Sequence, residues 1–290
     1  MNELEHNKNV SLLLEKMEWA DAILVGAASG MSAAAGHRFY YERDDDFIRL
    51  FGEFEKKYGF HNGFDGYYHP YPTRAEFWAF TATFIQHIYE SSGGEPYANL
   101  QLLLSGKNYH ILTTNQDTLF EQICPPEKIS AIQGDWRYFQ CLHRCHDAIY
   151  DNREQVRQMV DAIADCRVPE DLIPRCPKCG REMEPWVRGL SFLEGTKYRE
   201  EYRKVNTFLT ENRDRKILFL ELGVGRMTPM FIQQPFWDLT YQLLQSFYIT
   251  INPKDALLPI ELVEKGAKIK EDIAVVLRDA VQQHRKELGM

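Results

Sequence analysis

The chain has 290 residues, 44% of them hydrophobic and 26% charged, which suits one large domain or a large domain with a smaller inserted one. A net charge of −8 does not favour non-specific nucleic-acid binding, and no apolar run approaches the ~20 residues of a membrane helix, so we expect neither a nucleic acid nor a membrane as partner. The polar start, Met1 to Lys8, has no apolar signal-peptide core behind it. This predicts a cytoplasmic protein whose six cysteines are thiols or metal ligands.

A glycine-rich stretch follows the first buried strand that we predict, Ile23 to Val25. Gly26, Gly30 and Gly36 allow tight turns and a close approach of backbone to ligand. Ser32 offers an N-cap to the helix that comes next. Free N–H groups and the helix dipole would attract an anion there, so we interpret the stretch as a pyrophosphate cradle. The alternative is that its small residues serve close packing only.

The next region, residues 39–71, is dense in phenylalanine and tyrosine, and a helix over 74–90 follows it. We expect a small helical subdomain with its own core. A sharper hypothesis is that some tyrosines, Tyr40 and Tyr41 above all, line a mobile lid over the cradle.

A second buried strand, residues 109–112, ends in five polar residues, 113–117. Polar side chains at the carboxyl ends of parallel strands are where open α/β sheets bind ligands. Asn115 and Asp117 could also cap the helix that follows, but a cap needs one such residue, not five.

Two pairs of cysteines come later, Cys141 with Cys145 and Cys176 with Cys179. The second pair has the C-x-x-C spacing that brings two thiolates to one metal, so we predict a structural zinc ion held by four thiolates. The alternative is four reduced cysteines without metal. The other two cysteines, Cys124 and Cys166, are expected to be ordinary buried thiols. Two nearby histidines, His143 and His146, are substitute metal ligands if the register of the ligands differs.

Strands and helices alternate along the chain, which predicts an α/β fold: a doubly wound, mostly parallel Rossmann-like sheet with a smaller inserted zinc-ribbon and helical domain. The remaining predicted helices cover 9–21, 97–105, 194–212 and 271–287. A short strand followed by a turn is predicted within 129–135, and further strands over 217–222, 248–252 and, as an edge strand, 260–263. The expected Rossmann-like domain combines 1–38, 92–138 and 186–290, and the small domain combines the helical module 39–91 with the zinc ribbon 139–185.

The assembled pattern resembles the sirtuins. The run from Ala28 to Gly36 aligns with their Gly-Ala-Gly-Ile-Ser motif, and Thr113 to Asp117 with their Thr-Gln-Asn-Ile-Asp motif. Two cysteine pairs follow in the same order, then a loop from Gly223 to Pro229 and a strand-end Asn252. The resemblance covers nearly the whole chain.

The resemblance implies NAD as co-substrate and assigns residues to it. The implied catalytic residues are Asn115, Gln133 and Asp117. The implied NAD contacts are Ala28, Ser29, Gly30, Ser32, Gly36, Tyr40, Thr114, Asn115, Gln116, Asp117, Gln133, Gly223, Val224, Gly225, Asn252 and Pro253.

Three departures separate the chain from sirtuin deacylases. Gln133-Gly134 stands where they carry His-Gly, residues 37–40 replace their Pro-Asp-Phe-Arg, and their Phe-Gly-Glu segment is not recognisable near residues 186–189. Deacylation needs a general base toward the ribose hydroxyls, and a glutamine does not titrate near neutral pH. ADP-ribosyl transfer to a protein nucleophile needs no acyl migration, and Gln133 can still orient the ribose.

These changes resemble the macrodomain-linked branch of sirtuins, called class M, which implies protein mono-ADP-ribosylation. The implied partners are a lipoylated carrier protein similar to the glycine-cleavage H protein, as acceptor, and a macrodomain ADP-ribosyl hydrolase. Two alternatives stay open: an NAD-dependent deacylase that uses another base, and a non-catalytic sensor of NAD or ADP-ribose.

Overall fold

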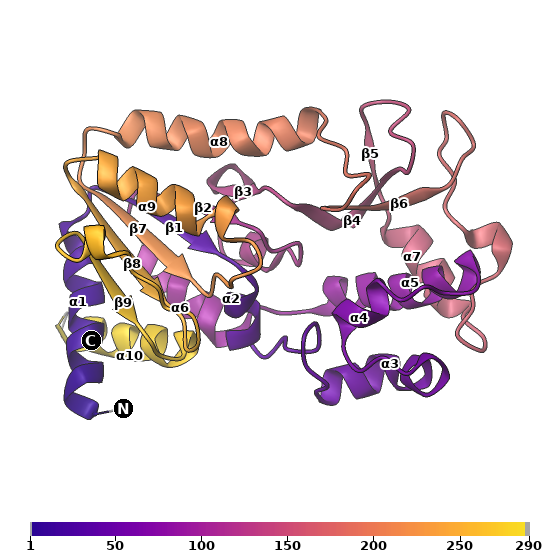
Figure 1. Cartoon of the computed structure of the whole chain (residues 1–290), viewed down its shortest axis with the longest axis horizontal. Helices are drawn as coiled ribbons and strands as arrows, with labels where there is room; N and C mark the ends of the chain where they lie inside the picture. Colours follow the sequence, from indigo (N-terminus) through magenta and orange to yellow (C-terminus); the bar gives the residue numbers. More distant parts are fainter. Residues whose placement is uncertain (1, 288–290) are drawn as a thin grey trace. The chain divides into compact units, whose positions relative to one another are not determined.

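The computed structural model describes residues 2–287, and the chain divides into two compact units (Figure 1). Of the described residues, unit 1 comprises 2–35, 92–133 and 199–287, and unit 2 comprises 36–91 and 134–198. The domain boundaries expected from the sequence stay a prediction.

Unit 1 is built on a six-stranded sheet in the order β3-β2-β1-β7-β8-β9. Every neighbouring pair is parallel, and the chain moves outward from β1 in both directions, as expected for a doubly wound sheet. The strands are β1 (Ala22–Ala27), β2 (Tyr109–Thr113), β3 (Ile129–Ala131), β7 (Ile217–Leu222), β8 (Ser246–Ile251) and β9 (Gly266–Ile269).

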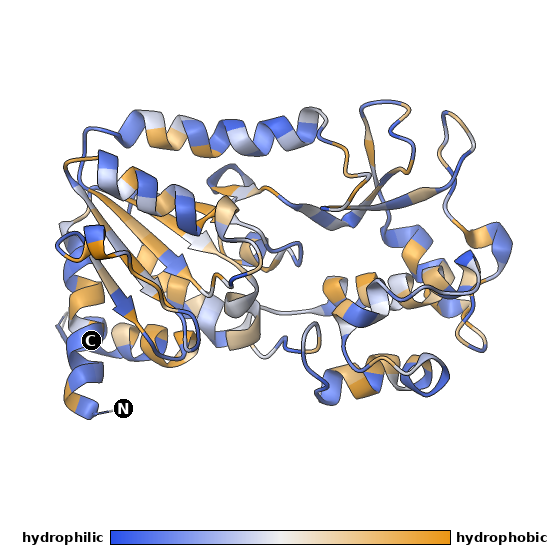
Figure 2. Cartoon of the chain, in the orientation of Figure 1, coloured by the Kyte–Doolittle hydropathy of each residue, from blue (hydrophilic) through white to orange (hydrophobic). Residues whose placement is uncertain are grey.

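Helices cover both faces of this sheet, because successive strand residues point to opposite sides. On β1, Ile23 and Val25 join one apolar cluster and Leu24 joins the other. One face packs against α1 (Glu3–Trp19), α6 (Gly94–Leu104) and α10 (Ile273–Glu287), and the other against α8 (Thr196–Asn212) and α9 (Gln233–Gln242). The central strands are accordingly mostly hydrophobic along their length, as their orange colour in Figure 2 shows.

One predicted strand is wrong. Residues 260–263 begin with a short 3-10 helix, Ile260–Leu262, directly behind Pro259. Ile260 is 80% exposed, so this apolar stretch does not enter the sheet. The edge strand is β9, whose backbone pairs with β8 from Gly266 onward.

Unit 2 combines a three-stranded antiparallel sheet, in the order β5-β4-β6, with four α-helices and a short 3-10 helix, Glu170–Leu172. The strands are β4 (Gly134–Cys141), β5 (Ile149–Asp151) and β6 (Met183–Val187), and the helices are α3 (Asp45–Tyr58), α4 (Gly63–Tyr67), α5 (Arg74–Glu90) and α7 (Arg153–Asp161). Thr73 and Glu76 form a capping box that starts α5 at the predicted residue.

Most aromatic residues of the 39–71 region pack in the core of unit 2, in one cluster with residues of the 134–187 segment, so they share a core with the antiparallel sheet rather than forming one of their own. The Phe51 ring packs 4.5 Å, centroid to centroid, from Phe80 of α5, and Phe84 packs 4.7 Å from Trp136 of β4. Among residues 2–287, no helix is both long enough and apolar enough to span a bilayer.

Candidate functional site

The turn after β1 approaches the turn after β7 so closely that side chains are excluded. The amides of Ala28 and Gly30 donate to the carbonyls of Leu222 (3.1 Å) and Gly223 (3.0 Å). A Cβ on Gly30 would lie 2.5 Å from the Gly223 Cα, and Gly223 itself has a positive φ of 65°. Binding a pyrophosphate through the Gly30 amide, as the sequence predicts, therefore requires its bond to Gly223 to be exchanged.

The role predicted for Ser32 as an N-cap is wrong. The helix begins earlier, as α2 (Ser29–Ala34) with Ala28 at its N-cap. It begins there because the amides of Ala28 and Gly30 bond to the turn after β7. Ser32 lies inside α2, where its hydroxyl donates to the carboxylate of Asp117. This bond joins the first glycine-rich turn to the polar end of β2.

Asn115 also ties the segment after β1 to the end of β2. Its Nδ2 donates to the Ala28 carbonyl (3.1 Å) and to the Ser32 hydroxyl (2.9 Å), and the residue is 9% exposed. Asp117 also accepts from the amide of Leu119 (3.2 Å), the first residue of the following 3-10 helix, whose N-cap is Thr118. We call Ser32, Asn115 and Asp117 the strand-end cluster.

Tyr97 of α6 belongs to the surroundings of this cluster. It is fully buried, and its hydroxyl has no hydrogen-bond partner among the described residues. Burial, and next the negative charge of Asp117, raise the pKa of Tyr97 well above its usual value, so the phenol is neutral.

Gln133 follows β3, and its carboxamide carries a buried donor that is not paired within the described part of the chain. Its backbone carbonyl accepts from Nε2 of Gln116 (2.9 Å). Its own Nε2 is buried and has no partner within residues 2–287. An unpaired buried donor is costly, so this amide fits an oxygen supplied by a bound molecule, such as a ribose hydroxyl.

The loop after β7 is held from the end of β8. Nδ2 of Asn252 donates to the Val224 carbonyl (2.9 Å), and its Oδ1 accepts from the amides of Lys254 and Asp255 (2.9 and 3.0 Å). The Asn252 side chain therefore orders this loop through protein contacts. Gly225 borders open space, since a Cβ added to it would have no atom within 4 Å.

The other predicted NAD contacts are not all joined to this group. Thr114 lies at the end of β2, where its amide donates to the Ala27 carbonyl (3.1 Å), and Pro253 is exposed beyond β8. Gly36 and Tyr40 belong to unit 2. The Tyr40 ring packs on Tyr41, Phe64 and Phe84, and burial raises its pKa, so it is a partly buried ring packed against the core of its own unit.

The four predicted metal ligands of unit 2 converge on one point. Their Sγ atoms all lie within 4.8 Å of one another, and the pairs Cys141–Cys179 and Cys145–Cys176 are 3.6 Å apart. Zn–S bonds of about 2.3 Å place tetrahedral sulfurs about 3.8 Å apart, whereas a disulfide bond is about 2.05 Å long. The cluster thus fits a structural zinc ion, with all four ligands from the protein. Nδ1 of His146 lies 3.0 Å from the Cys145 sulfur, outside the four-thiol set.

Comparison with solved structures shows the fold. No family model matches the chain. Sir2Tm bound to a propionylated peptide superimposes with a TM-score of 0.62 at 16% identity, covering 95% of this chain and 98% of that one. A Sir2 homologue–NAD complex superimposes with a TM-score of 0.59 at 15% identity, covering 96% and 94%. The fold is that of the sirtuins.

Comparison with curated proteins decides the family. A protein named protein ADP-ribosyltransferase from Staphylococcus aureus (strain Mu50 / ATCC 700699) is 34% identical over 282 residues, 96% of this chain and 89% of that protein. The chain belongs to the sirtuin-type protein ADP-ribosyltransferases. A second relative, from Fusarium oxysporum f. sp. cubense, is named probable bifunctional ADP-ribose hydrolase/ADP-ribosyltransferase. It is 28% identical over 271 residues, 89% of this transferase-type chain but 45% of the fungal protein.

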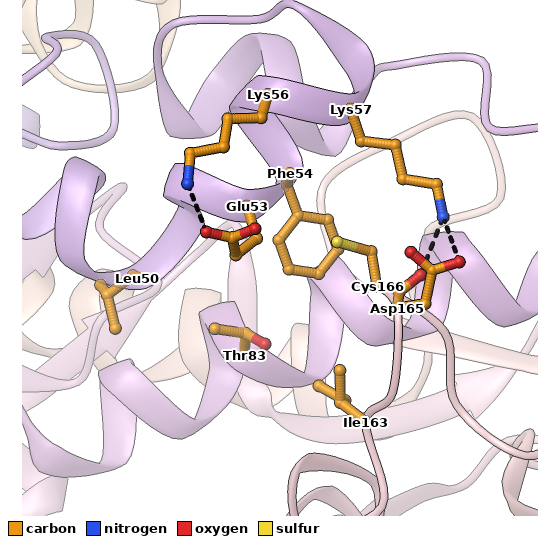
Figure 3. Close-up of a pocket in the computed structure, with 9 residues that line it drawn as sticks. All are labelled: Leu50, Glu53, Phe54, Lys56, Lys57, Thr83, Ile163, Asp165 and Cys166. Atoms are coloured by element: carbon orange, nitrogen blue, oxygen red, sulfur yellow. Dashed lines mark hydrogen bonds and ion pairs between the residues drawn. The ribbon is translucent and has the colours of Figure 1, made fainter.

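Unit 2 of this sirtuin-type chain also contains a cavity of about 610 Å³, between α3, α5 and the turn at Asp165 (Figure 3). Its lysines are paired: Lys56 lies 2.6 Å from Glu53, and Lys57 lies 3.2 Å from Asp165. None of its lining residues is among the predicted NAD contacts or metal ligands.

Two features of this sirtuin-type site escape sequence reasoning. Tyr97 gives no signal, because a tyrosine on a helix face is ordinary. Glu221 does give a signal, because it is a carboxylate inside the otherwise apolar strand β7, and the structure buries it completely.

Proposed function

We propose that this protein transfers ADP-ribose from NAD to a side chain of a protein acceptor and releases nicotinamide. The observation that carries the proposal is the relationship to the Staphylococcus aureus protein ADP-ribosyltransferase along 96% of the chain. The neutral Gln133, at the position where sirtuin deacylases carry a histidine, supports it, because transfer needs no base toward the ribose hydroxyls.

NAD, when bound, supplies the ADP-ribosyl group and the nicotinamide leaving group. In this proposal the pyrophosphate lies at the turns of Gly30 and Gly223, where the Gly30 amide exchanges its bond to the Gly223 carbonyl for one to the phosphate. Gly223, Val224 and Gly225 hold the adenosine part, with Asn252 keeping their loop in place. The strand-end cluster faces the nicotinamide ribose, with Asn115 and Asp117 supplying an amide and a carboxylate to it.

The transfer step exchanges one bond for another. The bond between the anomeric ribose carbon and the nicotinamide nitrogen breaks, and a bond from the acceptor nucleophile to that carbon forms. The bonding electrons leave with nicotinamide, which becomes neutral, and the nucleophile loses its proton to solvent. Gln133 contributes by donating its unpaired Nε2–H to a ribose oxygen, which fixes the orientation of the reacting carbon.

We further propose a lipoylated carrier protein as the acceptor and an ADP-ribosyl hydrolase as the functional counterpart. The sequence resemblance to class M sirtuins supports the first. The fungal relative, whose name joins a hydrolase to a transferase, supports the second. An apolar lipoyl arm would have few rings of the 39–71 region to meet, since most are core residues; Tyr41 and Tyr68 are exposed at 50% and 58%. The cytoplasm is the proposed compartment, because it keeps thiols reduced for a metal.

Mass spectrometry of a purified candidate acceptor, incubated with the protein and NAD, tests the proposal. Both a lipoylated carrier and its unlipoylated form are used, next to an acyl-lysine peptide. A gain of ADP-ribose on the lipoylated carrier alone supports both proposals, and a gain on either form supports transfer only. Efficient loss of the acyl group from the peptide without ADP-ribose transfer favours a deacylase, and NAD binding without either product favours a sensor.

A further inference from the structure

Glu221 is a fully buried carboxylate in the middle of the sheet of unit 1. Three neighbours donate to it: the Tyr248 hydroxyl (2.8 Å), the Thr250 hydroxyl (2.9 Å) and Nε2 of Gln233 (3.1 Å). Tyr248 and Thr250 belong to β8, whereas Gln233 is the first residue of α9. The carboxylate therefore joins the sheet to the start of a helix.

This position is costly for an acid. No lysine, arginine or histidine within residues 2–287 pairs with Glu221, and burial raises its pKa to about 7. The other titratable group that faces it is Tyr248, from β8, while α9 presents the neutral Gln233. An apolar residue would pack in such a strand without the cost of desolvating a carboxyl group. We therefore infer that the role of Glu221 lies in the hydrogen bonds that its carboxylate accepts.

The bond to Gln233 closes a loop. The loop, residues 223–232, connects β7 to α9 (Figure 1). It starts two positions after Glu221 and ends one position before Gln233. Its first residue is the Gly223 that meets Gly30, and its second is the Val224 that accepts from Asn252. Gln233 is 3% exposed, so the bond that joins the two ends of the loop is shielded from water.

We propose that Glu221 is a positioning residue for the nucleotide: through Gln233 it holds the 223–232 loop closed, and the closed loop fixes the backbone that receives the adenosine part of NAD. This inference rests on the proposed use of NAD. It assigns no contact with NAD to Glu221 itself, which acts through the loop.

Two single substitutions at the same carboxylate separate this role from a merely structural one. Gln233→Leu removes the bond that closes the loop and leaves the two bonds from β8. Tyr248→Phe removes one bond from the sheet and leaves the loop closed. Both variants lose one buried hydrogen bond to Glu221, so their loss of thermal stability should be similar.

The readouts are NAD affinity by calorimetry, the KM for NAD and kcat with the acceptor, and hydrogen exchange of the loop without ligand. Gln233→Leu should weaken NAD binding about tenfold, raise KM with little change in kcat, and speed amide exchange within residues 223–232. Tyr248→Phe should leave both the NAD affinity and the loop exchange close to wild type. Glu221→Leu should weaken NAD binding as Gln233→Leu does, and Glu221→Gln, which keeps an acceptor for Gln233, should recover most of the affinity.

Equal losses of NAD affinity in Gln233→Leu and Tyr248→Phe would overturn the inference, because the carboxylate would then act through general stability. Wild-type affinity and exchange in Gln233→Leu would overturn it as well. A wild-type protein that binds no NAD would refute the proposed function and with it the nucleotide part of the inference; the exchange measurement would still decide whether Gln233 closes the loop.

Discussion

The strand-end cluster of unit 1 and the cysteine cluster of unit 2 are both gatherings of polar groups, but they differ in what they leave unused. The four thiols converge within 4.8 Å and would fill every position of a tetrahedral zinc ion. The strand-end cluster lies close to groups that have no partner among the described residues: the Tyr97 hydroxyl and the Nε2 of Gln133. Four protein ligands complete a structural metal site, whereas a buried donor without a partner in residues 2–287, such as Nε2 of Gln133, is available to a bound molecule.

The largest expected effect would come from breaking the cysteine cluster of unit 2. Cys176→Ser removes one of four thiolates, and structural zinc contributes about 10–16 kcal/mol to the folding of small metal domains. We expect zinc to fall from one per chain to a trace by elemental analysis, and unit 2 to lose its cooperative thermal transition. Chelation of the wild-type protein should have the same effect.

Cys166→Ser is the matched control, because Cys166 is a buried thiol of the same unit outside the cluster. It should keep one zinc per chain. A folded, active Cys176→Ser variant without zinc would show that the cluster is four reduced cysteines with no metal to hold.

The next largest effect would come from the turns after β1 and β7, whose backbones meet at Gly30 and Gly223. A Cβ at Gly30 would meet the Cα and the carbonyl oxygen of Gly223 at 2.5 and 2.7 Å, so Gly30→Ala must push two backbones apart. We expect a stability loss of about 1–3 kcal/mol in chemical denaturation and at least a tenfold loss of NAD affinity by calorimetry. Gly225→Ala, with no atom within 4 Å, should cost no stability. Unchanged NAD affinity in Gly30→Ala would count against the placement of the pyrophosphate.

The proposed reacting centre can be tested with two side chains that differ in their bonding, Asn115 of the strand-end cluster and Gln133 after β3. Asn115→Ala breaks bonds to Ala28 and Ser32 and should lose both stability, by about 1–3 kcal/mol, and transfer activity. Gln133→Ala removes a side chain whose Nε2 bonds to nothing described, so the fold should keep its stability while transfer at saturating NAD falls about tenfold to a hundredfold. Wild-type rates in either variant would place the reacting centre elsewhere.

The sequence was sufficient for the features that depend on local pattern. Helix α5 and strand β7 have the predicted bounds, since a capping box at Thr73 and an apolar run from Ile217 define them locally. Ser32 and the 260–263 segment were mispredicted, because the Gly30–Gly223 approach and the choice of β9 as edge strand depend on contacts distant in sequence. Likewise, only the fold shows that Glu221 is bonded across from Gln233.

A polar cluster that is complete without any ligand gives the smallest expected effect. His6 of α1 contacts Glu271 through Nδ1 and Asp279 of α10 through Nε2 (3.0 Å). The hydrogen bond to Glu271 raises the pKa of His6 most; burial opposes it, and the charges of both acids add to it. Because the folded pKa exceeds the unfolded value of about 6.5, the stabilisation is complete below that pH and is lost as pH rises through the folded pKa.

We therefore expect the free energy of unfolding of the wild type, relative to His6→Ala, to decrease by up to about 1 kcal/mol as pH rises above 6.5, as for a partly exposed ion pair. Asn9→Ala is the control: Asn9 donates to the same Glu271 carboxylate at 2.7 Å but does not titrate, so its loss should lower stability evenly across this range. Denaturant titrations at several pH values measure both. A pH-independent difference between wild type and His6→Ala would mean that the histidine is neutral in the folded protein. The contacts of His6 with Glu271 and Asp279 would then stabilise the fold as hydrogen bonds alone.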